Sequence, residues 1–154
     1  MTVHLAHGTA PRRSLTSLLR TGGTTAGWPA NGAFVLGGGL VVGSAALHLH
    51  LWLTGYRHIA TIGPLFLLQF AVGVAIGLVV MVTRRTWAGL IGTLFALATI
   101  AGFLLSVNVG LFGFQDSWSA PLAGVAFALE SAAAALLLAA SALSARVHIH
   151  SPRP

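Results

Sequence analysis

Residues 61–82, TIGPLFLLQFAVGVAIGLVVMV, form an unbroken stretch without a charged residue. An α-helix rises about 1.5 Å per residue, so about 20 apolar residues are needed to cross the hydrocarbon core of a bilayer. Three further stretches meet this requirement, and the four expected spans are residues 33–53, 61–82, 87–112 and 120–145. The sequence therefore predicts an all-α bundle of four transmembrane helices.

The composition excludes a soluble domain. Of the 154 residues, 56% are hydrophobic and only 6% are charged, whereas about a quarter are charged in an ordinary soluble domain. The net charge of +6 comes from arginines scattered between apolar runs, not from the clustered basic face of a nucleic-acid-binding protein. The chain also has no Cys, so it contains neither a disulfide nor a thiolate metal site.

The arginines predict the orientation of the spans. Seven of the eight lie before span one, between spans two and three, or after span four, and only Arg57 lies on the other side. The positive-inside rule therefore predicts that both termini are cytoplasmic. We expect a cytoplasmic arm at 1–30, a membrane domain at 31–146 and a cytoplasmic tail at 147–154. High Gly and Ala content with Arg but no Lys suggests a GC-rich genome and a bacterial inner membrane.

The N-terminal arm has two possible interpretations. Leu15, Leu18 and Leu19 recur at helical spacing among arginines, which is typical of a short helix lying on anionic headgroups. Alternatively, Arg12 and Arg13 begin a twin-arginine export signal. This alternative is less favoured because the first apolar run begins about twenty residues later and no small-residue cleavage site follows it.

Pairs of small residues predict how the helices pack. Helices in lipid approach closely where small side chains recur four residues apart. Such pairs occur in three spans, at Gly39 and Gly43, Gly73 and Gly77, and Ala135 and Ala139. We therefore expect a compact bundle, in a homo-oligomer or a larger membrane complex.

Each span carries polar residues, and those at membrane depth are the default functional candidates. They are His48, Gln69, Asn108 and Glu130, all at mid-depth or in the half opposite most of the arginines. One interpretation is a shared polar site facing outward. The other is that Gln69 and Asn108 only form hydrogen bonds between helices. Glu130 has no Lys or Arg at its depth, so we expect it to be neutral at pH 7 and to form a hydrogen bond with one of the other three.

The histidines suggest a possible metal site. His48 and His50 lie close to His58 along the chain, and imidazole binds transition metals and haem iron. Residues two apart on a helix point about 200° from each other, so His48 and His50 cannot chelate one ion. A metal site would use His48 or His50 together with His58 and possibly Asp116, and the alternative is that the histidines are interfacial anchors. The terminal pairs, His4 with His7 and His148 with His150, are interpreted as solvated residues.

The first hairpin resembles a known class of protein. Residues 48–52 (HLHLW), 55–59 (GYRHI) and 61–69 (TIGPLFLLQ) are similar to the first hairpin of small, uncharacterised four-helix integral membrane proteins of high-GC bacteria. The resemblance covers residues 48–69, about a seventh of the chain. It implies a four-helix topology and a bacterial origin, but no catalytic or binding residue.

The sequence contains no hydrolytic motif, no phosphate-binding loop and no second membrane carboxylate, so we do not expect an enzyme. The preferred interpretation is an accessory or self-assembling subunit of a membrane complex. The alternative is a small proton- or metal-coupled transporter, or a metal- or haem-binding membrane protein, that uses Glu130 and the outer histidines. If Glu130, His48, Gln69 and Asn108 converge on one cavity, the transporter is favoured.

Overall fold

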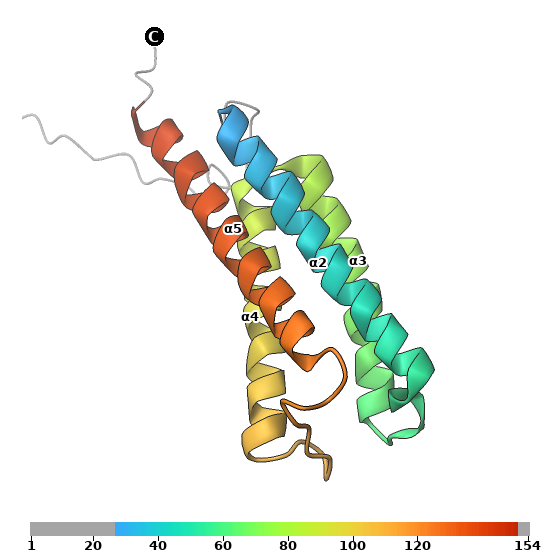
Figure 1. Cartoon of the computed structure of the whole chain (residues 1–154). Coiled ribbons are helices and arrows are strands. Elements are labelled where there is room, and N and C mark those ends of the chain that lie inside the picture. The colour runs from blue at the N-terminus through green and yellow to red at the C-terminus, as the bar shows by residue number, and fades with distance from the viewer. Residues whose placement is uncertain (1–26, 151–154) are drawn as a thin grey trace, which may run out of the picture.

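The computed structural model describes residues 27–150, with side chains through Arg146. This part of the chain is helical, with four long helices: α2 (Trp28–Thr54), α3 (Ile62–Thr83), α4 (Thr86–Asn108) and α5 (Ala123–His150). A short 3-10 helix, η1 (Tyr56–His58), links α2 to α3. All four long helices are long and apolar enough to span a membrane, and Figure 1 shows them gathered in one bundle. The predicted all-α fold with four spans is confirmed.

Four helix ends lie three or more residues from their predicted positions, among them the start of α5 at Ala123 instead of residue 120. Helix α2 begins five residues early, at Trp28, with Pro29 in its first turn, where a missing N–H is not needed. Helix α4 ends at Asn108 instead of continuing to residue 112 because the chain turns at Gly110, which has a φ of 86°. Helix α5 continues to His150, so the predicted tail begins as part of a helix. The predicted interfacial helix of the arm and the terminal histidine side chains lie outside the described residues.

Glycines set the contact between α2 and α3. A Cβ atom built on Gly77 would lie 2.7 Å from the carbonyl oxygen of Gly38, and one on Gly38 would lie 2.8 Å from the carbonyl oxygen of Gly77. The two backbones therefore approach closely, as small residues permit in lipid. The predicted role of Gly73 and Gly77 is confirmed. Gly39 and Gly43 have no neighbour at this position within 4 Å, and Ala135 and Ala139 are exposed, so these two pairs make no packing contact within the chain.

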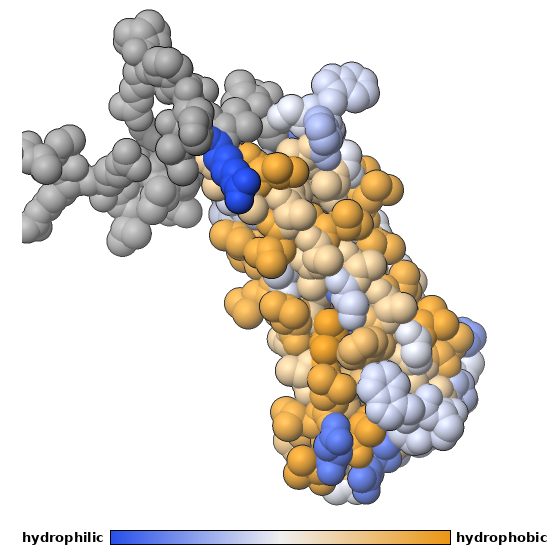
Figure 2. Space-filling view, turned by 60° about the vertical axis from the view of Figure 1, so that its left-hand side comes forward, coloured by the Kyte–Doolittle hydropathy of each residue, from blue (hydrophilic) through white to orange (hydrophobic). Residues whose placement is uncertain are grey.

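The bundle is densely packed at one end only. Its core centres on Phe34, Val80, Ala88 and Leu137, which lie toward the end that carries the α3–α4 turn. Helix α2 packs against both α3 and α5, and α4 packs mainly against α5, whereas α3 and α4 make few contacts with each other. The other end of the bundle carries η1 and the 109–122 loop (Figure 1). Figure 2 shows apolar residues along the visible flank of the bundle and hydrophilic residues at both ends.

Candidate functional site

A partly open cavity of about 390 Å³ lies in the loosely packed half of the bundle. The first half of α3 and the second half of α4 line it, together with parts of α2, α5, η1 and the 109–122 loop. Most of the lining is apolar, but His48, Gln69 and Glu130 also contribute to it. A mostly apolar cavity with a few convergent polar groups is the usual form of a small-molecule site.

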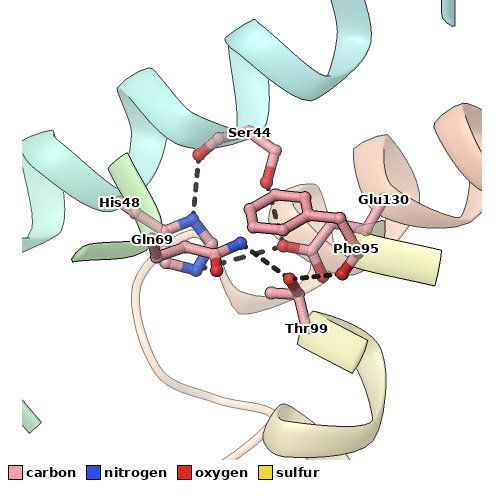
Figure 3. A network of polar contacts seen from close by, with 6 residues as sticks. All are labelled: Ser44, His48, Gln69, Phe95, Thr99 and Glu130. Carbon is pink, nitrogen blue, oxygen red and sulfur yellow. Dashed lines mark hydrogen bonds and ion pairs between the residues drawn. The ribbon is translucent and has the colours of Figure 1, made fainter. Parts of the chain in front are cut away.

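Glu130 lies at the centre of a buried polar cluster between α2 and α5. Its Oε1 atom accepts a hydrogen bond of 2.9 Å from the Ser44 hydroxyl and lies 3.9 Å from Nε2 of His48. Figure 3 shows these three side chains meeting across the gap between the two helices. Glu130, Ser44 and His48 are 3%, 2% and 8% exposed, so the cluster is removed from water except through the cavity.

The backbone determines which nitrogen of His48 carries the hydrogen. The Nδ1 atom lies 2.9 Å from the carbonyl oxygen of Ser44. A carbonyl oxygen can only accept, so Nδ1 is the donor, and in a neutral imidazole the other nitrogen is then an acceptor. The Nε2 atom of His48 therefore presents a lone pair toward Glu130. At 3.9 Å the two side chains are too far apart for a direct hydrogen bond.

Gln69 belongs to a second network that joins α3 to α4. Its Nε2 atom donates a 2.7 Å hydrogen bond to the Thr99 hydroxyl, which donates in turn to the backbone carbonyl of Phe95 at 3.0 Å. Figure 3 shows this network beside the Glu130 cluster, and Gln69 and Thr99 line the same cavity. The predicted interhelical hydrogen bond of Gln69 is therefore present.

Asn108 does not join this site. Its Nδ2 atom donates to the carbonyl oxygen of Leu104, one turn back on its own helix, at 2.7 Å. The side chain is exposed and is not part of the cavity lining. Both interpretations of Asn108, as a member of the polar site and as an interhelical partner, are therefore wrong. Its own helix satisfies the amide, as happens with short polar side chains in helices.

The three histidines predicted as a metal site do not come together. His48 is buried in the cavity wall, whereas His50 and His58 are exposed. The Nε2 atom of His58 accepts a 2.8 Å hydrogen bond from Arg57, so this lone pair is already in use. Within residues 27–146, no three His, Asp or Glu side chains lie close enough to hold a metal ion. The prediction of a metal site formed by His48, His50 and His58 is therefore wrong.

Aromatic rings run from the loops to the polar cluster. Phe114 packs edge-on against Tyr56, with ring centroids 5.9 Å apart. Tyr56 stacks on Phe66 at 4.5 Å, and Phe66 lies 5.2 Å from the ring of His48. All four rings line the cavity. Burial of Tyr56, reinforced by the neighbouring Asp116 carboxylate, raises the pKa of its hydroxyl above the usual value.

Two partners of the polar groups were not predicted. Ser44 lies one helical turn before His48 and therefore shares its face, a spacing that was available in the sequence. Thr99 carries no such signal, because hydroxyls in apolar helices usually bond to their own backbone. The position of Asp116 against the cavity depends on the path of the 109–122 loop, which hydropathy does not predict.

The site holds a carboxyl group whose surroundings offer one hydroxyl donor and one imidazole acceptor, at the wall of a cavity large enough for a small organic molecule. Such a group can bind a proton or an ammonium group. Comparison of the chain with protein-family models, curated proteins and solved structures finds no match.

Proposed function

We propose that this protein is a small multi-pass transporter that binds a small molecule in the 390 Å³ cavity and couples its binding to the protonation of Glu130. The observation that supports this function is the contact of Glu130 with Ser44 and His48 in the cavity wall. Ionisable groups inside a membrane are costly, and for this reason they mark substrate and proton pathways.

Coupling follows from the two states of the Glu130 carboxyl. With the cavity empty, a proton on Glu130 avoids an uncompensated charge among apolar side chains. A bound molecule that offers a hydrogen-bond donor or a positive charge compensates an ionised carboxyl, so the proton leaves as the molecule binds. Proton movement and ligand movement are then linked through one side chain.

We further propose that the cavity end of the bundle faces outward and that both termini are cytoplasmic. Arg84, Arg85 and Arg146 lie at the end of the bundle opposite η1, and the positive-inside rule assigns arginine-rich ends to the cytoplasm. The proposed location is a bacterial inner membrane, based on the Gly, Ala and Arg content and on the resemblance of the first hairpin to small four-helix bacterial membrane proteins.

The experiment uses three probes with one aryl-alkyl body: 4-phenylbutylammonium, pentylbenzene and 5-phenylpentanoate. The unfolding temperature of the purified protein in detergent is measured with each probe, because a ligand that binds the folded state raises it. Ala126→Trp fills the cavity from α5, and Ala139→Trp places the same ring on an exposed face of that helix.

We expect at least one probe to stabilise the wild type and Ala139→Trp, but not Ala126→Trp. We then impose a gradient of this probe across reconstituted vesicles that contain a pH-sensitive dye. The internal pH should change faster with the wild type than with Glu130→Gln or with protein-free vesicles, which report the passage of the uncharged probe through the lipid. If none of the three probes stabilises the wild type, the proposed binding function is wrong.

A second candidate function is that of a non-enzymatic accessory or self-assembling subunit. It is favoured by Gly39 and Gly43 on α2 and by Ala135 and Ala139 on α5, which are exposed and available for another helix. Gly39→Leu with Gly43→Leu should then dissociate an oligomer that chemical crosslinking detects in membranes. Unchanged crosslinking would count against this assignment.

A further inference from the structure

We infer that the cavity selects an amphipathic ammonium ion, with its N–H group between Glu130 and His48 and its apolar body along the cavity. This inference names the ligand class and rests on the proposed binding function. It is based on the charges of the lining, the hydrogen-bonding groups that face each other in the cluster, and the aromatic rings that lead to the cluster.

The distribution of charge favours a cation. The whole chain has two acidic residues, Asp116 and Glu130, against eight arginines. Both acids line the cavity, and none of the arginines among the described residues does so. Asp116 lies in the 109–122 loop, and Glu130 lies deeper, on α5. A chain of net charge +6 thus carries its acidic groups in one cavity, where low-dielectric walls strengthen their attraction for a cation.

The hydrogen-bonding groups favour a cation that carries N–H. Ser44 supplies one donor to Glu130. The Nε2 lone pair of His48 and an ionised Glu130 are both acceptors, and they lie 3.9 Å apart, too far for a direct hydrogen bond between them. A primary or secondary ammonium has two or more donors and can satisfy both acceptors. A quaternary ammonium has no N–H group, so it leaves the Nε2 lone pair of His48 without a donor and leaves Glu130 with the Ser44 hydroxyl alone.

The rings supply a path for the ion. Phe114, Tyr56 and Phe66 lead from the Asp116 loop to His48, with successive centroids between 4.5 and 5.9 Å apart. The faces of aromatic rings attract ammonium groups, and this attraction increases away from water. Tyr56 and Phe66 stack on each other, so each ring has one face left for such a contact. The Asp116 and Glu130 carboxylates supply the stronger attraction for an ammonium in this cavity. A metal cation would lose its water shell in this mostly apolar cavity for few oxygen ligands.

The test compares dissociation constants, measured by calorimetry with the full chain in detergent. The probes are 4-phenylbutylammonium, its trimethylammonium analogue, the neutral isostere pentylbenzene and 5-phenylpentanoate. The primary ammonium should bind about tenfold to a hundredfold more tightly than the other three, the range expected for hydrogen bonds to a charged group. Glu130→Gln, which keeps the volume of the side chain, should remove this preference.

Any of the following results would overturn the inference. Equal binding of pentylbenzene or tighter binding of 5-phenylpentanoate would show that the cavity does not select a cation, while leaving the proposed binding function intact. Equal binding of the trimethylammonium analogue would exclude the bridging N–H. Failure of all four probes would overturn the proposed function as well. If Glu130→Gln does not fold, Ser44→Ala replaces it, because it also removes a group from the cluster, and it should weaken the preference for the primary ammonium.

Discussion

Among the described residues, Glu130 has a single protein donor, the Ser44 hydroxyl at 2.9 Å. Hydrogen bonds between helices in membranes contribute about 0.6 kcal/mol on average and up to about 1.7 kcal/mol. Because the Ser44 bond reaches a buried carboxyl, Ser44→Ala is expected to lower the free energy of unfolding toward the upper end of this range. Denaturant titration followed by circular dichroism measures the change. Ser131→Ala, a substitution next to Glu130 but outside the cluster, serves as the control and should change stability less.

Tyr56 is the only tyrosine in the chain, so its titration can be followed by ultraviolet absorbance. Burial and the Asp116 carboxylate both disfavour the negative tyrosinate and raise the pKa of Tyr56 above its usual value near 10. We therefore expect the tyrosinate band to appear at higher pH than for free tyrosine. Asp116→Asn should lower the midpoint in part, because burial remains. A midpoint unchanged by Asp116→Asn would contradict the assigned contact.

The sequence predicts which single residues are unusually polar for an apolar helix, but not which of them contact each other in the structure. Glu130 and His48 stand out because they are ionisable in apolar helices, and the structure brings them to one cavity. Asn108 stands out equally, yet it bonds to Leu104 on its own helix. Polarity at membrane depth does not distinguish these outcomes, because a side-chain amide can be satisfied locally or by a neighbouring helix.

The contact between α2 and α3 depends on glycine. A Cβ atom on Gly77 would lie 2.6 Å from the Val42 side chain and 2.7 Å from the backbone oxygen of Gly38, which cannot rotate away. Gly77→Ala is therefore expected to lower the free energy of unfolding by about 1–3 kcal/mol, the usual range for overpacking. Gly43→Ala, with open space at its Cβ position, is the matched control and should not destabilise the protein. Equal losses from both would contradict this packing.

The helices themselves could be predicted because about 20 apolar residues can adopt few structures in a bilayer. Their ends could not be predicted as well. Leu122 and Gly110 have positive φ angles next to α5 and α4, and these local turns move the helix ends by three or four residues. The spacing of small residues was also insufficient to predict the contacts between helices. It identifies a face of a helix but not the neighbouring helix that packs against that face. Gly73 and Gly77 are covered by α2, whereas Ala135 and Ala139 are exposed.

The molecule as a whole is asymmetric along its length. The core around Phe34 and Leu137 fills one end, and the cavity with both acidic residues occupies the other. The arginines at 84, 85 and 146 lie at the packed end. The sequence predicts the charge asymmetry, but the cavity follows from the separation of α3 and α4, which depends on how all four helices pack together.

The proposed orientation predicts the labelling of introduced cysteines, since the chain has none of its own. Ser117→Cys lies in the 109–122 loop, and Thr83→Cys lies at the end of α3. A membrane-impermeant maleimide should label Ser117→Cys in intact cells. It should label Thr83→Cys only after the membrane is opened. The reverse pattern would show that the cavity end faces the cytoplasm.

Infrared difference spectroscopy of the reconstituted protein shows directly whether Glu130 exchanges its proton for an ammonium ion. The chain has only two carboxyl side chains, Asp116 and Glu130, so Asp116→Asn and Glu130→Gln assign the bands. Adding 4-phenylbutylammonium at pH 7 should remove a protonated carboxyl band and produce a carboxylate band in the wild type and Asp116→Asn, but not in Glu130→Gln. A Glu130 band that does not change when the ammonium binds would contradict the account.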